Sequence, residues 1–257
     1  MSSHPVFDVT GAVTLITGGS SGIGLQLVRA MIRAGAKVAS VARAHDAAIC
    51  KTLQNEAANG FEPVFIAADI RCQEEIVNMF DAAEQAFGTV TVLFNNAGVS
   101  EKKRTGKITR ESWREIMSVN VDGQFFTAQE AARRMIAAKA GGSIVNTTSI
   151  LAQSAMRGTA AYSISKAAVM QMTRSLALEL AAHQIRVNAV APGWFPTRMN
   201  AEFLAGLGGD FIRSQNPMKR LGEAGDLDGV ALLLASSASR YITGTVLTVD
   251  GGQSLVS

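Results

Sequence analysis

A tyrosine and a lysine four residues apart, Tyr162 and Lys166, have a spacing that could support proton transfer. The surrounding segment, 160–182, has the composition of a helix, and residues at i and i+4 of a helix lie on one face, about 5–6 Å apart at Cβ. An ammonium beside a phenol favours the phenolate, so we expect the Tyr162 pKa to fall below its reference near ~10. Such a phenol gives or takes a proton near neutral pH, whereas an ordinary tyrosine beside a solvated lysine does no chemistry.

A glycine-rich turn lies between an expected strand and an expected helix near the N-terminus. It reads Thr17-Gly18-Gly19-Ser20-Ser21-Gly22-Ile23-Gly24. Glycines permit a tight turn and let the backbone approach a pyrophosphate closely. The helix that follows presents free N–H groups and the positive end of its dipole to that anion. The turn therefore predicts a dinucleotide-binding site.

Strands alternate with helices along the whole chain. The expected strands are 13–17, 37–42, 64–68, 90–94, 143–147, 187–191 and 246–249, and the expected helices are 23–34, 47–58, 74–87, 112–138, 160–182 and 227–235. This order predicts right-handed β-α-β crossovers. We therefore expect one α/β domain over residues 1–257, a doubly wound, Rossmann-type parallel seven-stranded sheet with helices on both faces.

Residues 194–216 interrupt this alternation with bulky apolar side chains and glycines. They follow the sixth strand, at the edge where open α/β sheets bind ligands. We expect a small helical lid over the substrate. The alternative is that these aromatic side chains simply pack above the sheet.

The bulk composition excludes several classes of function. The net charge of the 257 residues is only +3, without a basic stripe, so no nucleic-acid partner is expected. Cys50, Cys72 and the three histidines have no metal-ligand spacing, so we expect reduced thiols and no metal. The sequence shows neither a secretory signal nor an apolar run of about 18 residues, and we expect a cytoplasmic protein without a membrane partner.

Three motifs resemble those of the short-chain dehydrogenase/reductase family in their order and spacing: Thr17-Gly18-x3-Gly22-x-Gly24, Asn95-Asn96-Ala97-Gly98 and Tyr162-x3-Lys166. Four further matches are Asp69-Ile70, Asn120, Ser149 and Pro192-Gly193-x3-Thr197. The resemblance covers roughly residues 8–253. The pattern is most similar to 3-oxoacyl-carrier-protein reductases and to gluconate and sugar-alcohol dehydrogenases.

The resemblance implies a role for each catalytic position. Tyr162 would be the general acid and base, Ser149 would bind the substrate oxygen, and Lys166 would lower the Tyr162 pKa and hold the nicotinamide ribose. Asn120 would hold a water that relays protons to Lys166; independently, an amide inside a long helix suggests a hydrogen-bonding task. The implied cofactor-binding residues are Gly18, Ser20, Ser21, Gly22, Ile23, Gly24, Arg43, Asp69, Ile70, Asn95, Ala97, Gly98, Tyr162, Lys166, Pro192, Gly193 and Thr197.

The end of the second strand predicts which nicotinamide cofactor is used. In NAD-preferring proteins of this type an acidic residue there binds the ribose 2′-OH. Here the strand ends in Ala42, followed by Arg43. A guanidinium without a neighbouring carboxylate favours NADP(H) over NAD(H). Ser21 stands where many NADP-specific relatives carry a second basic residue, so NAD(H) remains the alternative.

The substrate is predicted only by class. The apolar character of 194–216 suggests a small or medium, partly apolar carbonyl compound, contacted by Ser149, Tyr162, Trp194, Phe195, Met199 and Phe203. Lys102-Lys103-Arg104 could meet an acidic substrate or form a solvated loop.

Three other functions stay open. A gluconate or sugar-alcohol dehydrogenase fits the pattern. A 3-oxoacyl-carrier-protein reductase fits less well, because His183 stands where those enzymes carry a basic residue. A non-catalytic, nucleotide-sensing relative would lose part of the set Ser149, Tyr162 and Lys166, which is complete here. The resemblance also implies a homotetramer that pairs through helices 112–138 and 160–182 and through the last strand.

Overall fold

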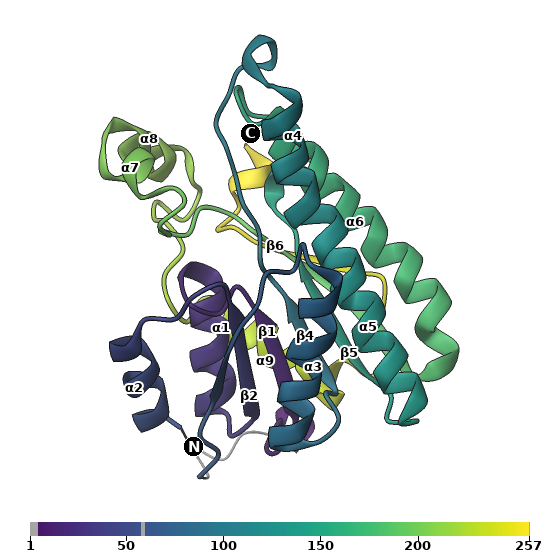
Figure 1. The fold of residues 1–257 in the computed structure, drawn as a ribbon. Helices are drawn as coiled ribbons and strands as arrows, with labels where there is room; N and C mark the ends of the chain where they lie inside the picture. Colours follow the sequence, from purple (N-terminus) through teal and green to yellow (C-terminus); the bar gives the residue numbers. More distant parts are fainter. Residues whose placement is uncertain (1–4, 58–59, 257) are drawn as a thin grey trace.

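Seven parallel strands form one sheet in the order β3-β2-β1-β4-β5-β6-β7 (Figure 1). The structure, a computed structural model, describes residues 5–57 and 60–256. The strands are β1 (Val13–Thr17), β2 (Lys37–Ala42), β3 (Val64–Ala67), β4 (Val92–Asn95), β5 (Gly142–Thr147), β6 (Ile185–Pro192) and β7 (Val246–Val249). The order reverses at β1, which pairs with both β2 and β4, and ligands of such sheets bind beside this reversal. The predicted fold class is confirmed.

Helices cover both faces of the sheet (Figure 1). One face carries α3 (Gln73–Phe87), α5 (Gln124–Ala137) and α6 (Ala160–Leu180), and the other carries α1 (Gly22–Arg33), α2 (Ala47–Asn55) and α9 (Asp228–Ala235). In the parts of the chain that the structure describes, no helix has the length and apolar character needed to cross a membrane.

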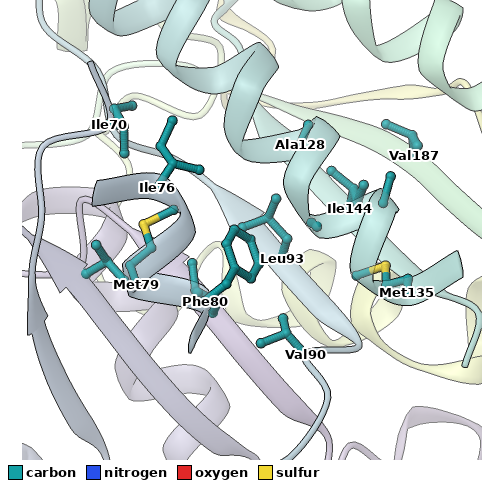
Figure 2. Close-up of a cluster of buried hydrophobic side chains, with 14 of the residues drawn as sticks. Ile70, Ile76, Met79, Phe80, Val90, Leu93, Ala128, Met135, Ile144 and Val187 are labelled. Atoms are coloured by element: carbon teal, nitrogen blue, oxygen red, sulfur yellow. The ribbon is translucent and has the colours of Figure 1, made fainter. Parts of the chain in front are cut away.

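The strands are apolar on both faces because each face is covered by helices. Successive residues of a strand enter opposite cores: Leu15 and Ile144 point into one, and their neighbours Ile16 and Val145 into the other. Figure 2 shows the first core, in which Phe80 of α3 packs among side chains of the sheet and of α5. The period of two in each strand therefore builds both layers of the fold.

Most element boundaries agree with the prediction to within three residues. Strands 13–17, 37–42 and 246–249 match β1, β2 and β7 in full. Helix α2 ends at Asn55, whereas the expected end, Ala58, lies outside the described residues.

The expected continuous helix over 112–138 is wrong. The structure has α4 (Arg110–Met117), a π-helical segment η3 (Ser118–Gly123) and then α5. Asn120 lies in η3 and is fully buried, and its amide bonds the backbone of Val99 and the hydroxyl of Ser165. A π-helical turn widens the helix locally and commonly marks a functional site. The interruption brings the Asn120 amide to these partners.

Residues 194–216 contain two short helices, α7 (Ala201–Ala205) and α8 (Leu207–Gln215), beyond the carboxyl end of β6 (Figure 1). Their base is packed: Phe195 is buried, and the rings of Trp194 and Phe203 lie 5.4 Å apart. The outer part exposes Met199 and Phe211. The segment therefore combines a packed base with an exposed outer part, and its role as a lid over the substrate stays a prediction.

Candidate active site

A cleft of about 480 Å³ lies at the carboxyl ends of the strands. Such a volume suits a small ligand or cofactor. Its walls come from the loops that follow β1, β2, β3, β4, β5 and β6, since these ends meet at one edge of a parallel sheet. It brings together these predicted residues: Gly18, Ser20, Ser21, Gly22, Ile23, Gly24, Arg43, Asp69, Ile70, Ala97, Gly98, Ser149, Tyr162, Lys166, Pro192, Gly193, Phe195, Thr197 and Met199.

The glycine-rich turn is shaped for an anion. A Cβ on Gly24 would lie 2.1 Å from the Gly18 carbonyl oxygen, so no larger residue allows the turn to fold this tightly against α1. The N-cap of α1, Ser21, makes no side-chain cap bond, and the first turn contains no acidic residue. The first N–H groups of α1 are therefore left for a ligand, and they fit the pyrophosphate of a dinucleotide.

The opposite wall is formed by the loops that follow β2 and β3, and Asp69 is its acidic residue. The Arg71 Nε donates to both Asp69 carboxylate oxygens at 3.0 Å, and Arg71 Nη1 reaches Glu115 at 2.9 Å. The hydrogen bond from Arg71 holds the Asp69 pKa below its ordinary value. Arg43 lines the same wall, and no ion-pair partner for it occurs within residues 5–57 and 60–256. Arg71 was not predicted as a site residue, although it directly follows Asp69 and Ile70, which were.

Lys166 carries a buried ammonium at the other end of the cleft. Its side chain is 3% exposed, and Nζ donates a hydrogen bond of 2.7 Å to the Thr147 carbonyl oxygen. Burial disfavours the charged form and lowers the Lys166 pKa to about 8. Nζ lies 5.8 Å from the centroid of the Tyr162 ring.

The expected fall of the Tyr162 pKa is wrong for this structure. Burial of the phenol disfavours the phenolate and raises its pKa, and the neighbouring Ser149 hydroxyl offsets only part of the increase. The Lys166 ammonium is directed to the Thr147 carbonyl, so helical spacing alone does not place it on the phenolic oxygen. Tyr162 therefore remains a protonated phenol at neutral pH, the form of a proton donor.

Asn120 lies behind the catalytic wall and does not line the cleft. Its Oδ1 accepts from the Val99 N–H at 2.8 Å, and its Nδ2 donates to Ser165 Oγ at 2.9 Å. Ser165 Oγ in turn donates to the Tyr162 carbonyl oxygen. A Cβ on Gly98 would lie 3.2 Å from Asn120 Oδ1 and 3.4 Å from Lys166 Nζ, so the two side chains converge behind this glycine. A water relay between them stays a prediction.

Asn95, predicted to bind the cofactor, does not line the cleft, whereas its neighbour Asn96, for which no role was predicted, does. Asn95, the last residue of β4, is fully buried, and its Nδ2 donates to Gln124 O at 2.7 Å and to Asn146 Oδ1 at 3.1 Å. Asn96 lines the cleft, and its N–H donates to Thr17 Oγ1. Because successive residues of a strand point to opposite sides, Asn95 and Asn96 could not both have faced the cleft.

The predicted substrate residues divide into two groups. Ser149, Tyr162, Phe195 and Met199 line the cleft. Trp194 and Phe203 pack on each other outside it, and Lys102 Nζ lies 4.5 Å from the Phe203 ring centroid. Val99 and Arg198 also line the cleft and were not predicted. Each directly follows a residue that was predicted to bind the cofactor, Val99 after Gly98 and Arg198 after Thr197, and this position was the available signal.

Comparisons with known proteins find relatives that match almost the whole chain. A family model described as enoyl-(acyl carrier protein) reductase matches residues 18–254. Gluconate 5-dehydrogenase of Gluconobacter oxydans is 35% identical over 97% of this chain and 98% of its own length. The NADP-dependent (R)-specific alcohol dehydrogenase of Lentilactobacillus kefiri is 34% identical over 94% and 96%. The crystal structure of a gluconate 5-dehydrogenase from Burkholderia cenocepacia in complex with NADP and tartrate has a TM-score of 0.91 at 32% identity, covering 98% of both chains.

The buried ammonium makes folding stability depend on pH. The Lys166 pKa is about 8 in the folded protein and 10.5 ordinarily, so between these values the unfolded chain binds more protons. Stability from this group therefore rises with pH, by up to about 3 kcal/mol. The wild type should gain this amount over Lys166→Met between pH 8 and 10.5 in urea unfolding. A difference between the two proteins that does not change with pH would contradict the lowered pKa.

Proposed function

The chain belongs to the short-chain dehydrogenase/reductase family, and we propose that it interconverts a ketone and a secondary alcohol with NADP(H). One observation carries the proposal. A single cleft holds the glycine-rich turn and Arg43 at one end, and Ser149, Tyr162 and Lys166 at the other. A dinucleotide laid along it would bring its nicotinamide to the residues that can move a proton.

The nicotinamide, when bound, supplies the hydride for reduction and accepts it in oxidation. The Tyr162 phenol donates its proton to the substrate oxygen in reduction and takes it back in oxidation. Its raised pKa supports the acid role at neutral pH. The Ser149 hydroxyl hydrogen-bonds the same oxygen and stabilises the negative charge that develops there. Lys166, 5.8 Å from the Tyr162 ring, stabilises the phenolate left after proton transfer.

The lining of the catalytic end supports a partly apolar substrate. Val99 and Met199 line the same cleft as Ser149 and Tyr162. This combination holds a carbonyl group by hydrogen bonds and an attached hydrocarbon portion by apolar contact. We therefore favour a small or medium carbonyl compound.

A sugar acid is the second candidate. Two of the similar proteins are gluconate 5-dehydrogenases, one of them crystallised with tartrate. Lys102, at the lid, offers a cation for such a carboxylate. A carrier-bound acyl substrate has less support, because His183 is exposed where carrier-protein reductases carry a basic residue. A non-catalytic role has least support, since Ser149, Tyr162 and Lys166 all lie at the cleft.

Replacing the phenol tests the enzyme directly. Tyr162→Phe should lower the kcat of ketone reduction by about 10²–10⁴-fold, because the proton donor is lost, while the NADPH Kd changes by no more than about tenfold, the cost of one neutral hydrogen bond. The matched control is Tyr241→Phe, since Tyr241 is the other tyrosine of the chain and is fully exposed. Undiminished reduction by Tyr162→Phe across a panel of ketones would refute the mechanism.

The cofactor assignment has its own test. Arg43→Ala should lower kcat/KM for NADPH by about tenfold or more, the usual cost of a lost hydrogen bond to a charged group, and leave NADH within about threefold. Lys51→Ala, which removes an exposed cation from α2, is the control. A wild-type preference for NADH would reverse the assignment.

We also propose a homotetramer, for which two exposed features offer support. Trp113 of α4 and Phe125 and Phe126 of α5 are exposed aromatic side chains, and the two phenylalanine rings lie 5.5 Å apart. Strand β7 ends the sheet and leaves its outer edge without a strand partner among the described residues. Apolar patches and free sheet edges are favoured sites of association.

Sedimentation checks the assembly. Phe126→Asp should shift the protein from a tetramer to a smaller species, because a carboxylate would be buried in the interface. Phe211→Asp changes an exposed aromatic residue of α8 and should leave the tetramer intact. A wild type that sediments as a monomer at micromolar concentration would exclude this assembly.

A further inference from the structure

The loop at the base of the lid, residues 195–200, is fastened by one side chain. Asn200 Oδ1 accepts from the Thr197 N–H at 2.8 Å and from Thr197 Oγ1 at 3.1 Å, while Nδ2 donates to the Phe195 carbonyl oxygen at 2.8 Å. Phe195 itself is buried. These bonds span the loop on both sides of Arg198 and hold its backbone in one conformation.

This loop lies directly against the glycine-rich turn. Gly22, at the start of α1, has φ +54°, and a Cβ there would lie 3.0 Å from Thr197 Cγ2. The next residue of the loop, Arg198, lines the cleft together with Ser20 and Ser21. The Arg198 backbone is thus fixed beside the N-terminus of α1.

The Arg198 guanidinium is uncommitted. In the part of the chain that the structure describes, it has neither a hydrogen-bond nor an ion-pair partner. Thr197 cannot serve in its place as a donor, because its hydroxyl proton is given to Asn200. Arg198 is therefore the side-chain donor that this loop offers to a ligand, with five N–H groups available.

The charges of the cleft favour an anion at this point. The cations that line it are Arg43, Arg71, Lys166 and Arg198, and Asp69 is the acidic residue among its walls. Asp69 is already bound by Arg71. The first turn of α1 adds the positive end of its dipole. An anion beside Ser20 and Ser21 would be attracted from both the helix and the lid.

We infer that Arg198 is a cofactor-binding residue that pairs with the pyrophosphate of the dinucleotide from the lid side of the cleft. The inference rests on the proposed function. It separates two guanidinium roles: Arg43 distinguishes NADPH from NADH, whereas Arg198 binds the group that both share. The pyrophosphate is favoured over a substrate anion because Thr197, the residue before Arg198, lies against Gly22 of the glycine-rich turn.

The test is direct binding, measured by fluorescence titration of NADPH and NADH at fixed ionic strength. Arg198→Ala should raise both Kd values by the same factor, about tenfold or more, because a charged hydrogen-bond donor is lost. Arg198→Lys should recover part of the loss. Arg213→Ala removes the same charge from α8 of the lid, where Arg213 pairs with Asp210, and should leave both Kd values within about twofold.

Competition with nucleotide fragments locates the contact. ADP should lose affinity for Arg198→Ala by the same factor as the dinucleotides, whereas adenosine should bind the variant and the wild type equally. Equal NADPH and NADH affinities in Arg198→Ala and wild type would overturn the inference. So would a loss confined to NADPH, or a change only in the KM of an anionic substrate. The two proposals fail differently. A wild type that binds no dinucleotide would refute the proposed function and the Arg198 inference together, whereas a wild type that binds dinucleotide as tightly as Arg198→Ala would refute the inference alone.

Discussion

The ammonium of Lys166 is a buried positive charge that no carboxylate neutralises within the described residues. Its hydrogen bond is to a backbone carbonyl, that of Thr147 at the end of β5. A buried charge without an ionic partner is costly, and the lowered pKa of Lys166 measures that cost. The surrounding architecture is what makes the cost tolerable. The strand end supplies the acceptor, and Asn120 and Ser165 form a fully bonded polar layer beside it.

The same constraint organises the catalytic end of the cleft. Burial lowers the pKa of the lysine and raises that of the phenol, so the charged form of each group is disfavoured until a partner arrives. At neutral pH this leaves a protonated Tyr162 and a cation nearby that can stabilise its conjugate base. When Tyr162 gives its proton to a substrate oxygen, the phenolate that remains supplies the negative partner that the Lys166 ammonium otherwise lacks. The electrostatics of the site are therefore better matched to the reacting state than to the resting one.

The dinucleotide end is built by a different means. There the positive potential comes from the dipole of α1 and from side chains at the cleft surface, not from a buried charge. Because the sheet is parallel, the loops after β1, β2 and β6 reach this end together, although they are far apart in sequence. The lid base is joined to the glycine-rich turn through Thr197 and Gly22. Contact between these two segments relates the lid to the phosphate site.

Much of the fold followed from local sequence pattern. The strands were recovered because a sheet covered on both faces requires apolar residues at consecutive positions, and the helices because their apolar residues recur with a period of about 3.6; both patterns are visible in a short window. The interruption at Ser118–Gly123 was not recovered. Asn120 in this segment bonds Val99 and Ser165, residues 21 and 45 positions away. A window along the chain contains no information on such partners.

The sequence by itself determined the order of elements, the glycine-rich turn and the residue types of the site, Ser149, Tyr162 and Lys166 among them. Only the tertiary structure decided how those residues are placed and charged. It put Asn96 and not Asn95 at the cleft, directed Lys166 to a carbonyl, and reversed the expected direction of the Tyr162 pKa. The physical reason is that residue type and spacing act locally, whereas burial and charge environment sum over segments that meet only when the chain folds.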